Sequence, residues 1–155
     1  MDPTAAWAAL LRVHAALTPV LDQELQAAHG LPLTWYDVLL ELNAAPDRSL
    51  TMTRLGQVAV VSRSRVSRVV DELVRAGLVE RVPNPDDGRS AFAVLTAAGR
   101  RRFLAGAKAY LPAIDHEFAP VGTEGLRRLA EALETALAAV DPEAPIRERP
   151  SPSRR

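Results

Sequence analysis

The chain has 155 residues, of which 48% are hydrophobic, a length and content typical of one globular unit with its own core. It contains no cysteine, which excludes disulfides, thiolate zinc sites and sensing by thiol oxidation. Its uninterrupted apolar runs are far shorter than the roughly 20 residues of a membrane span, and residues 1–4 do not look like a secretion signal. We therefore expect a cytoplasmic protein that contacts no membrane.

Positive charge is concentrated in the middle of a chain whose net charge is zero. Residues 48–102 carry eleven arginines and five acidic residues, a net charge of +6, whereas residues 1–47 carry −5 and residues 103–144 carry −4. Lys108 is the single lysine, and arginine suits bidentate contacts with bases and phosphates better than lysine does. GC-rich codon usage would give the same preference for arginine. The basic middle segment nevertheless indicates a nucleic-acid partner.

Two helices are predicted before the basic segment. Residues 5–28 carry apolar side chains at the three- and four-residue spacing of one helix face. Pro19 is expected to kink or loosen this helix, and Gly30 to end it. Thr34 is expected to cap a second helix. That helix stops near Pro46, because the residue before a proline avoids helical geometry.

The basic segment opens with two short helical patterns joined by a tight turn. Thr51 or Thr53 can cap the first helix, and Ser62 can cap the second, which runs to about Ala76. Two short helices in this arrangement are typical of a helix-turn-helix.

The second short helix has one narrow apolar stripe, formed by Val66, Val69, Val70 and Leu73. The residues between them must face outward. In DNA recognition, arginines on a helix read guanine edges in the major groove, hydroxyls make adaptable contacts, and the helix N-terminus favours phosphates. We predict that this helix contacts DNA through Ser62, Arg63, Ser64, Arg65, Ser67 and Arg68.

A β-hairpin is predicted after this helix. Residues 78–82 and 91–95 are short runs rich in valine and other apolar residues, and the loop 83–90 between them is a dense turn signal. An arginine at the tip of a hairpin can enter a minor groove, where narrow A·T tracts concentrate negative potential. We predict that Arg89 makes this contact and that Asp87 orients it through a salt bridge.

Two long helices are predicted after the hairpin. Thr96 can cap the first, which is interrupted by Pro112 and ends near Gly122. The second starts at residues 123–124 and repeats leucine every three to four residues. Residues 142–155 are rich in proline and charge without periodicity, so we expect a disordered tail whose arginines add non-specific affinity for DNA.

The chain resembles the MarR (multiple antibiotic resistance regulator) family of winged-helix repressors in the stretch VAVVSRSRVSRVVDELVRAGLVER, followed by NPDDGRSAFAVLT. The likeness covers the helix-turn-helix, the wing motif Asp87-x-Arg89 and the Leu95-Thr96-x-x-Gly99 exit into the next helix. Arg65 departs from the residues usual at its position, so no operator sequence follows from the resemblance.

The resemblance implies a mainly α fold with a small β-hairpin wing. Residues 34–96 would form a winged helix-turn-helix, and residues 1–33 and 97–141 a helical dimerisation region. It also implies a homodimer that binds an inverted repeat in double-stranded DNA and is released by a small, commonly aromatic effector. A monomer with two such long amphipathic helices would expose a large apolar surface.

Four residues are candidates for binding an effector between the dimerisation helices and the DNA-reading region. They are Trp7, His14, Trp35 and Tyr36. Aromatic side chains commonly line ligand crevices, but on helices they are more often part of the core. The three histidines lack the spacing of a metal site, so we expect neither a metal nor a cofactor.

No catalytic motif is recognisable, and we expect no enzyme activity. Two alternatives to a ligand-responsive repressor stay open. One is a winged-helix interaction module that binds a protein or RNA partner without operator-specific DNA binding. The other is a DNA-binding protein that responds to no ligand.

Overall fold

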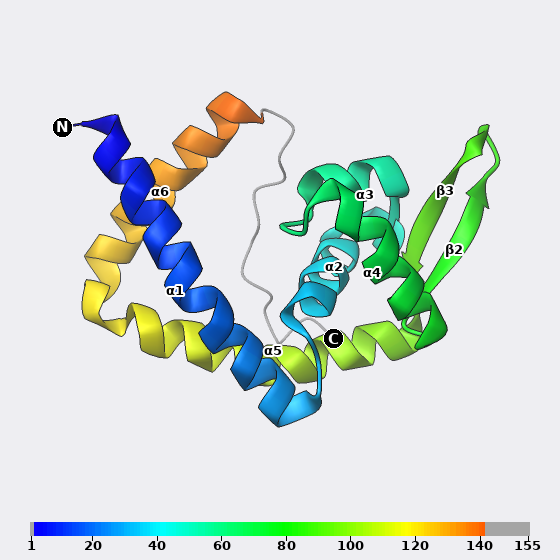
Figure 1. The fold of residues 1–155 in the computed structure, drawn as a ribbon, viewed down its shortest axis with the longest axis horizontal. Coiled ribbons are helices and arrows are strands. Elements are labelled where there is room, and N and C mark those ends of the chain that lie inside the picture. The colour runs from blue at the N-terminus through cyan, green and yellow to red at the C-terminus, as the bar shows by residue number, and fades with distance from the viewer. Residues whose placement is uncertain (1, 142–155) are drawn as a thin grey trace.

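The computed structural model describes residues 2–141, and this part of the chain contains six α-helices and one three-stranded sheet (Figure 1). The predicted fold class, mainly α with a small β-hairpin, is confirmed. The predicted tail, 142–155, lies outside the described residues. In chain order the elements are α1 Pro3–His29, α2 Leu33–Ala44, β1 Ser49–Thr51, α3 Met52–Val58, α4 Arg63–Arg75, β2 Val79–Asn84, β3 Asp87–Leu95, α5 Ala97–Phe118 and α6 Gly122–Val140, with 3-10 turns at Pro46–Arg48 and Ala119–Val121.

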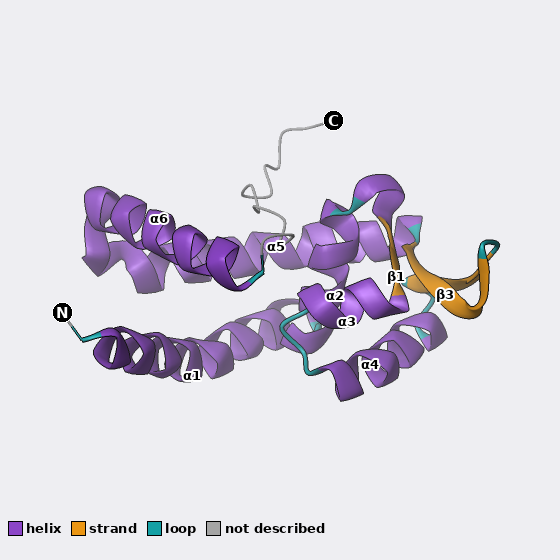
Figure 2. Cartoon of the chain, turned by 90° about the horizontal axis from the view of Figure 1, so that it is seen from above, coloured by secondary structure: helices purple, strands orange, loops and turns teal. Residues whose placement is uncertain are grey.

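Helix α5 runs along the base of the molecule and connects two parts (Figures 1 and 2). On one side lies the head, residues 33–96, with α2, α3, α4 and the sheet. On the other side lies the arm, which consists of the first two thirds of α1 (residues 3–20) and α6. Leu21 and Leu25, near the end of α1, are buried, and Leu17 is partly buried against the same core, so α1 joins the core through its C-terminal half.

The sheet is antiparallel with the strand order β1-β3-β2. Strand β1, which pairs Leu50 with Ala93, was not predicted from the sequence. The prediction of an eight-residue loop between the hairpin strands was wrong. Strands β2 and β3 extend almost to the tip and pair Asn84 with Asp87. The Asn84 side chain donates a hydrogen bond to Ser90 Oγ (2.9 Å), which holds the two strands together there.

Helix caps decide where several elements begin. Thr51 accepts a hydrogen bond from the backbone of Arg54, and Thr96 accepts one from Gly99, as the sequence predicted. The predicted cap at Thr34 was wrong, since α2 begins one residue earlier. The backbone N–H of Leu33, the first residue of α2, instead donates a hydrogen bond to Asp22 Oδ1 of α1 (2.8 Å).

Helices α1 and α5 both continue through a proline. The predicted interruption at Pro112 was wrong, because α5 is continuous across this proline. Helix α1 is likewise continuous across Pro19, and the kink expected there stays a prediction. A proline removes one N–H donor and leaves one carbonyl of the helix without a partner. Both prolines are exposed, so water can bond these carbonyls and the cost of the lost hydrogen bond is low.

An aromatic cluster joins the head to α5. Tyr36 of α2 is fully buried, and its ring centroid lies 5.2 Å from that of Phe103 and 4.5 Å from that of Tyr110, both on α5. Gly106 lets the helices approach closely, since a Cβ there would lie 2.9 Å from the Leu31 side chain and 3.1 Å from the Tyr36 ring.

Among the described residues, α1 is the one helix that is long and apolar enough to cross a membrane. The count of uninterrupted apolar residues in the sequence did not reveal this. Only 6% of the most apolar 18-residue window of α1 is buried in this chain. One such helix near the N-terminus is a weak indication of a span, because an apolar helix covered by protein has the same composition.

Gly99 lies at the first turn of α5, against Leu78 in the turn between α4 and β2. A Cβ added there would lie 2.0 Å from the carbonyl oxygen of Leu78, whereas one added at Gly88 would meet nothing within 4 Å. We expect Gly99→Ala to lower the free energy of unfolding by about 1–3 kcal/mol or more, because backbone must move. Gly88→Ala should change it little. Urea unfolding of both variants tests this, and equal midpoints would contradict it.

Two tyrosines make the stability sensitive to alkaline pH. Burial, and then the charge of Asp37, raises the pKa of Tyr110 to about 12, and burial also raises the pKa of Tyr36. The unfolded chain loses these protons near pH 10, so stability should be complete below pH 10 and fall as the pH rises towards about 12. Urea unfolding at several pH values should show a shallower decline for Tyr110→Phe, and an unchanged decline would contradict the assignment.

Candidate nucleic-acid interface

Helix α4 is held in the head by one face. The apolar stripe predicted from the sequence is buried as expected, and Ser62 occupies the N-cap position, although its side chain makes no capping hydrogen bond. The buried side chains of the stripe are Val66, Val69, Val70 and Leu73.

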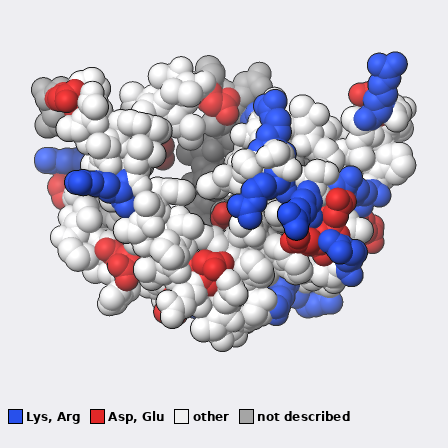
Figure 3. Space-filling view, in the orientation of Figure 1, with Lys and Arg blue, Asp and Glu red and all other residues white. Residues whose placement is uncertain are grey.

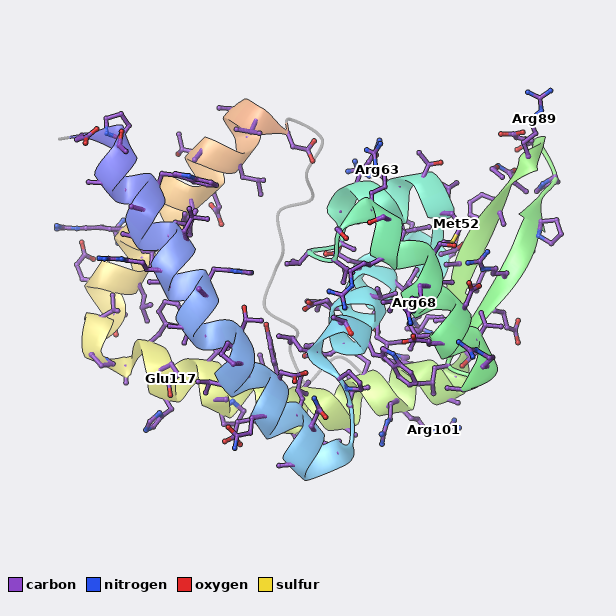
Figure 4. The ribbon with its side chains drawn as sticks, in the orientation of Figure 1. Met52, Arg63, Arg68, Arg89, Arg101 and Glu117 are labelled. Carbon is purple, nitrogen blue, oxygen red and sulfur yellow. The ribbon has the colours of Figure 1, made fainter. Side chains whose placement is uncertain are left out.

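All six predicted DNA-contacting residues of this segment are exposed on the opposite face. They are Ser62, Arg63, Ser64, Arg65, Ser67 and Arg68. Space-filling shows that positive charge on this side of the molecule gathers over the head and at the tip of the wing, the hairpin β2–β3 (Figure 3). Arg63 and Arg89 point outward at the same end of the head, whereas Arg101 lies on the opposite side of the molecule (Figure 4).

An open groove of about 760 Å³ separates α3 and α4 from the wing. Met52 and Gly56 of α3 line one end of it, and Met52 is seen between α4 and the wing in Figure 4. Three arginines line the same groove: Arg63 from α4, Arg81 from β2 and Arg89 from β3. This arrangement presents cationic donors from two elements to anything that enters between them.

The wing tip is shaped by side chains bonding to backbone. Asp87 Oδ1 accepts a hydrogen bond from the backbone N–H of Arg89 (3.0 Å), and Asn84 Oδ1 accepts one from the N–H of Asp86 (3.0 Å). The predicted salt bridge between Asp87 and the Arg89 guanidinium is not among the ion pairs of residues 2–141. Asp87 therefore orders the turn from which Arg89 projects, because its carboxylate is directed at the main chain.

Arg81 ties the wing to α4, a role that was not predicted. Its Nη2 lies 2.9 Å from Asp71 Oδ1 and donates hydrogen bonds to the backbone oxygen and Oγ of Ser67, each at 3.2 Å. The alternation of strand side chains could have revealed this residue, since Val79 is buried and a side chain two positions on lies on the same face of the sheet.

A second unpredicted tie joins α2 to α4. Trp35 Nε1 donates a hydrogen bond to Glu72 Oε2 at 3.0 Å, and Glu72 Oε1 lies 3.7 Å from Nε of Arg68. No local pattern pairs residues that are 37 positions apart. Trp35, a candidate effector-binding residue, is thereby connected to the face of α4 that carries the arginines.

The structure does not bring the four effector candidates together. Tyr36 is enclosed by the aromatic cluster of α5, and Trp35 is directed to α4. Trp7 and His14 are exposed on the arm. Trp7 precedes the first buried residue of α1, Leu21, by about 21 Å at the rise of an α-helix. The sequence-based idea of one shared crevice in a single chain lacks support in this geometry.

No group of three or more acidic or histidine side chains that could hold a metal ion occurs within residues 2–141.

The arrangement resembles solved transcriptional regulators over nearly the whole chain. A MarR family regulator from Streptomyces coelicolor, Sco3205, solved in complex with DNA, is 30% identical with a TM-score of 0.78 over 90% of this chain and 88% of that one. AbsC, a MarR family regulator from the same organism, is 28% identical with a TM-score of 0.76 over 92% of this chain and 97% of that one. A mutant MarR from E. coli complexed with operator DNA, at 22% identity and a TM-score of 0.69 over 88% and 99% of the two chains, shares the fold.

Sequence comparison gives the same assignment for the head. An uncharacterized protein of Mycobacterium tuberculosis, Rv2011c, is 42% identical over 60 residues, which are 39% of this chain and 42% of that protein. The match therefore spans less than half the length of this curated relative. The model of the MarR family matches residues 29–90, which contain the helix-turn-helix and most of the wing. From these matches and the fold, we conclude that the chain belongs to the MarR family of transcriptional regulators.

Proposed function

We propose that this protein is a sequence-selective transcriptional repressor that binds an inverted repeat in double-stranded DNA as a homodimer in the cytoplasm. The observation that carries the proposal is the pairing of two arginine-bearing elements on one face. The exposed side of α4 carries Arg63, Arg65 and Arg68, and the wing carries Arg89 beside it across an open groove.

The two elements match two grooves of DNA. A major groove about 12 Å wide admits an α-helix, and arginines there bind guanine edges. A narrow minor groove attracts an arginine, and Arg89 extends from the wing tip (Figure 4). In this proposal α4 enters the major groove and the wing reaches the flanking minor groove. The half-sites of a dimer would lie about one helical turn, or roughly 34 to 36 Å, apart.

Unburied apolar faces on the arm support the homodimer. No residue of α6 is buried in the single chain, and Trp7 of α1 is 59% exposed. Both helices lie at the same end of the molecule (Figure 2), and exposed apolar surface of this extent is characteristic of an interface. The large exposed apolar residues of the two helices are Trp7, Leu10, Leu11, Val13, Val20, Leu129, Leu133, Leu137 and Val140.

Release by a small aromatic effector is the remaining part of the proposal. Its structural support is the position of α2, whose consecutive residues Trp35 and Tyr36 contact α4 and α5 respectively. A ligand that moved either side chain would alter how the head is held on α5. Release of labelled operator by candidate aromatic acids would test this part.

Selection of bound duplexes from a random DNA pool tests the function directly. We expect an inverted repeat to be enriched, and its affinity to fall steeply with salt because phosphate contacts release counterions. A scrambled duplex of the same length serves as control. Weak binding that ignores sequence, or preference for RNA, would instead favour an interaction module with a protein or RNA partner.

Three arginine variants separate base reading from backbone contact. Arg65→Ala and Arg68→Ala should each weaken binding to the selected operator by about 1–3 kcal/mol if the side chain contacts guanine. Arg89→Ala should weaken binding to operator and to scrambled DNA more evenly, since Arg89 is attracted by the negative potential of the minor groove. Arg101→Ala removes the same charge from the opposite side of the molecule and is the control. Fluorescence anisotropy titrations measure all four, and losses equal to the control would remove the assignments.

A charge on α6 should disrupt the dimer only where it falls on the apolar face. Leu133→Glu places a carboxylate among the exposed leucines, whereas Ala132→Glu places one beside Arg128 on the polar face, four residues away. We expect the native protein and Ala132→Glu to sediment at twice the chain mass of 16.8 kDa, and Leu133→Glu to sediment as a monomer at micromolar concentration. A monomeric native protein would refute the proposed dimer.

A further inference from the structure

Glu72 is shared between a side chain of the head core and an arginine of the DNA-facing surface. One carboxylate oxygen, Oε2, accepts the indole N–H of Trp35 at 3.0 Å. The other, Oε1, lies 3.7 Å from Nε of Arg68, one helical turn earlier on α4. The three side chains thus form a chain of contacts from α2 to the exposed face of α4.

Trp35 and Arg68, the two partners of Glu72, differ in exposure. The less exposed partner, Trp35, is the one that holds Glu72 in place. Trp35 is half-buried, and a buried indole N–H without an acceptor is costly, so its hydrogen bond holds Glu72 in place. The Arg68 side chain is 83% exposed, against 35% for Glu72. A long exposed guanidinium samples many rotamers, and a fixed carboxylate beside its Nε restricts them.

Arg68 is distinguished in this way from the other arginines of the same face. Within residues 2–141, Arg63 and Arg65 pair with no carboxylate. The α4 face therefore presents two arginines without a carboxylate partner among the described residues and one, Arg68, that lies beside a carboxylate. A nearby carboxylate also repels phosphates, which weakens the attraction of Arg68 for DNA of any sequence.

We propose that Trp35 and Glu72 are positioning residues that orient Arg68 for reading one base pair and so set the sequence selectivity of the protein. This inference rests on the proposed binding of DNA through α4. It assigns to Trp35 a role in specificity that does not require an effector, and it assigns to Glu72 a role in recognition without contact with DNA.

The test compares operator and scrambled DNA for Trp35→Phe and Glu72→Gln. Trp35→Phe keeps a ring in the same place and removes the N–H, and Glu72→Gln keeps an acceptor for the indole while removing the charge beside Arg68. We expect each variant to lower the ratio of operator to scrambled affinity by about threefold, the size expected for an exposed ion pair. For Glu72→Gln, affinity for scrambled DNA should also rise.

Two controls separate positioning from general effects. Glu80→Gln, on an exposed residue of β2, changes the net charge of the head equally and should raise both affinities without altering their ratio. In an Arg68→Ala background, Trp35→Phe and Glu72→Gln should no longer change the ratio, because the residue through which they act is absent. Urea unfolding of each variant reports any loss of stability separately, and the indole Nε1–H signal of Trp35 should shift in Glu72→Gln.

The outcomes distinguish this inference from the proposed function. If the native protein selects no operator, the proposed function fails, and the inference fails with it. If the native protein is selective and both variants have the same ratio of operator to scrambled affinity as the native protein, the positioning role alone is overturned. The positioning role would also be overturned if the variants lowered the ratio of operator to scrambled affinity in the Arg68→Ala background, because they would then act through another group.

Discussion

The organisation of the head depends on the burial of one narrow stripe of α4. Val66, Val70 and Leu73 are almost completely buried, and each buried aliphatic side chain of this size contributes roughly 1.5–3 kcal/mol. Rotating α4 to hide its arginines would expose this stripe and bury charges, which is far more costly. The apolar stripe thus keeps the polar face outward, and no separate interaction is needed to expose it.

Side-chain ties then fix α4 relative to its neighbours. Arg81 joins the wing to α4 through Asp71 and Ser67, and Trp35 joins α2 to α4 through Glu72. Both ties include an acidic residue in the second half of the helix, Asp71 or Glu72. The first half, where the arginines and serines are concentrated, is left free of such ties except at Ser67 and Arg68. The helix is therefore anchored by its C-terminal turns and open to a partner at its N-terminal turns.

The arm, unlike the head, is packed against the rest of the chain mainly where it joins α5. Leu21 and Leu25 anchor α1 against α5, and Arg102 of α5 donates a hydrogen bond to the backbone of His29 at the end of α1. Beyond this joint, α1 and α6 carry large apolar side chains that stay exposed within residues 2–141. In the proposed homodimer a second copy of the chain would cover them, because the same two helices would then form both halves of the interface.

The sequence determined those features that depend on residues close together in the chain. The period of apolar residues revealed the buried stripe of α4, the hydroxyl side chains of Thr51 and Thr96 marked two helix starts, and the turn residues placed the hairpin. The exposed face of α4 followed from the stripe alone, so the sequence was sufficient to name the residues on that face. These features are local because they depend on helix geometry, on capping and on turn chemistry.

Tertiary packing decided what no local pattern contains. The start of α2 is set by Asp22, eleven residues earlier, which is why the cap expected at Thr34 was wrong. The pairing of Trp35 with Glu72, and of β1 with β3, joins segments distant in sequence. Such contacts form because buried polar groups must find partners wherever the fold places them. The sequence alone specified which face α4 exposes, and only the folded chain placed the Trp35 indole against the carboxylate that lies beside Arg68.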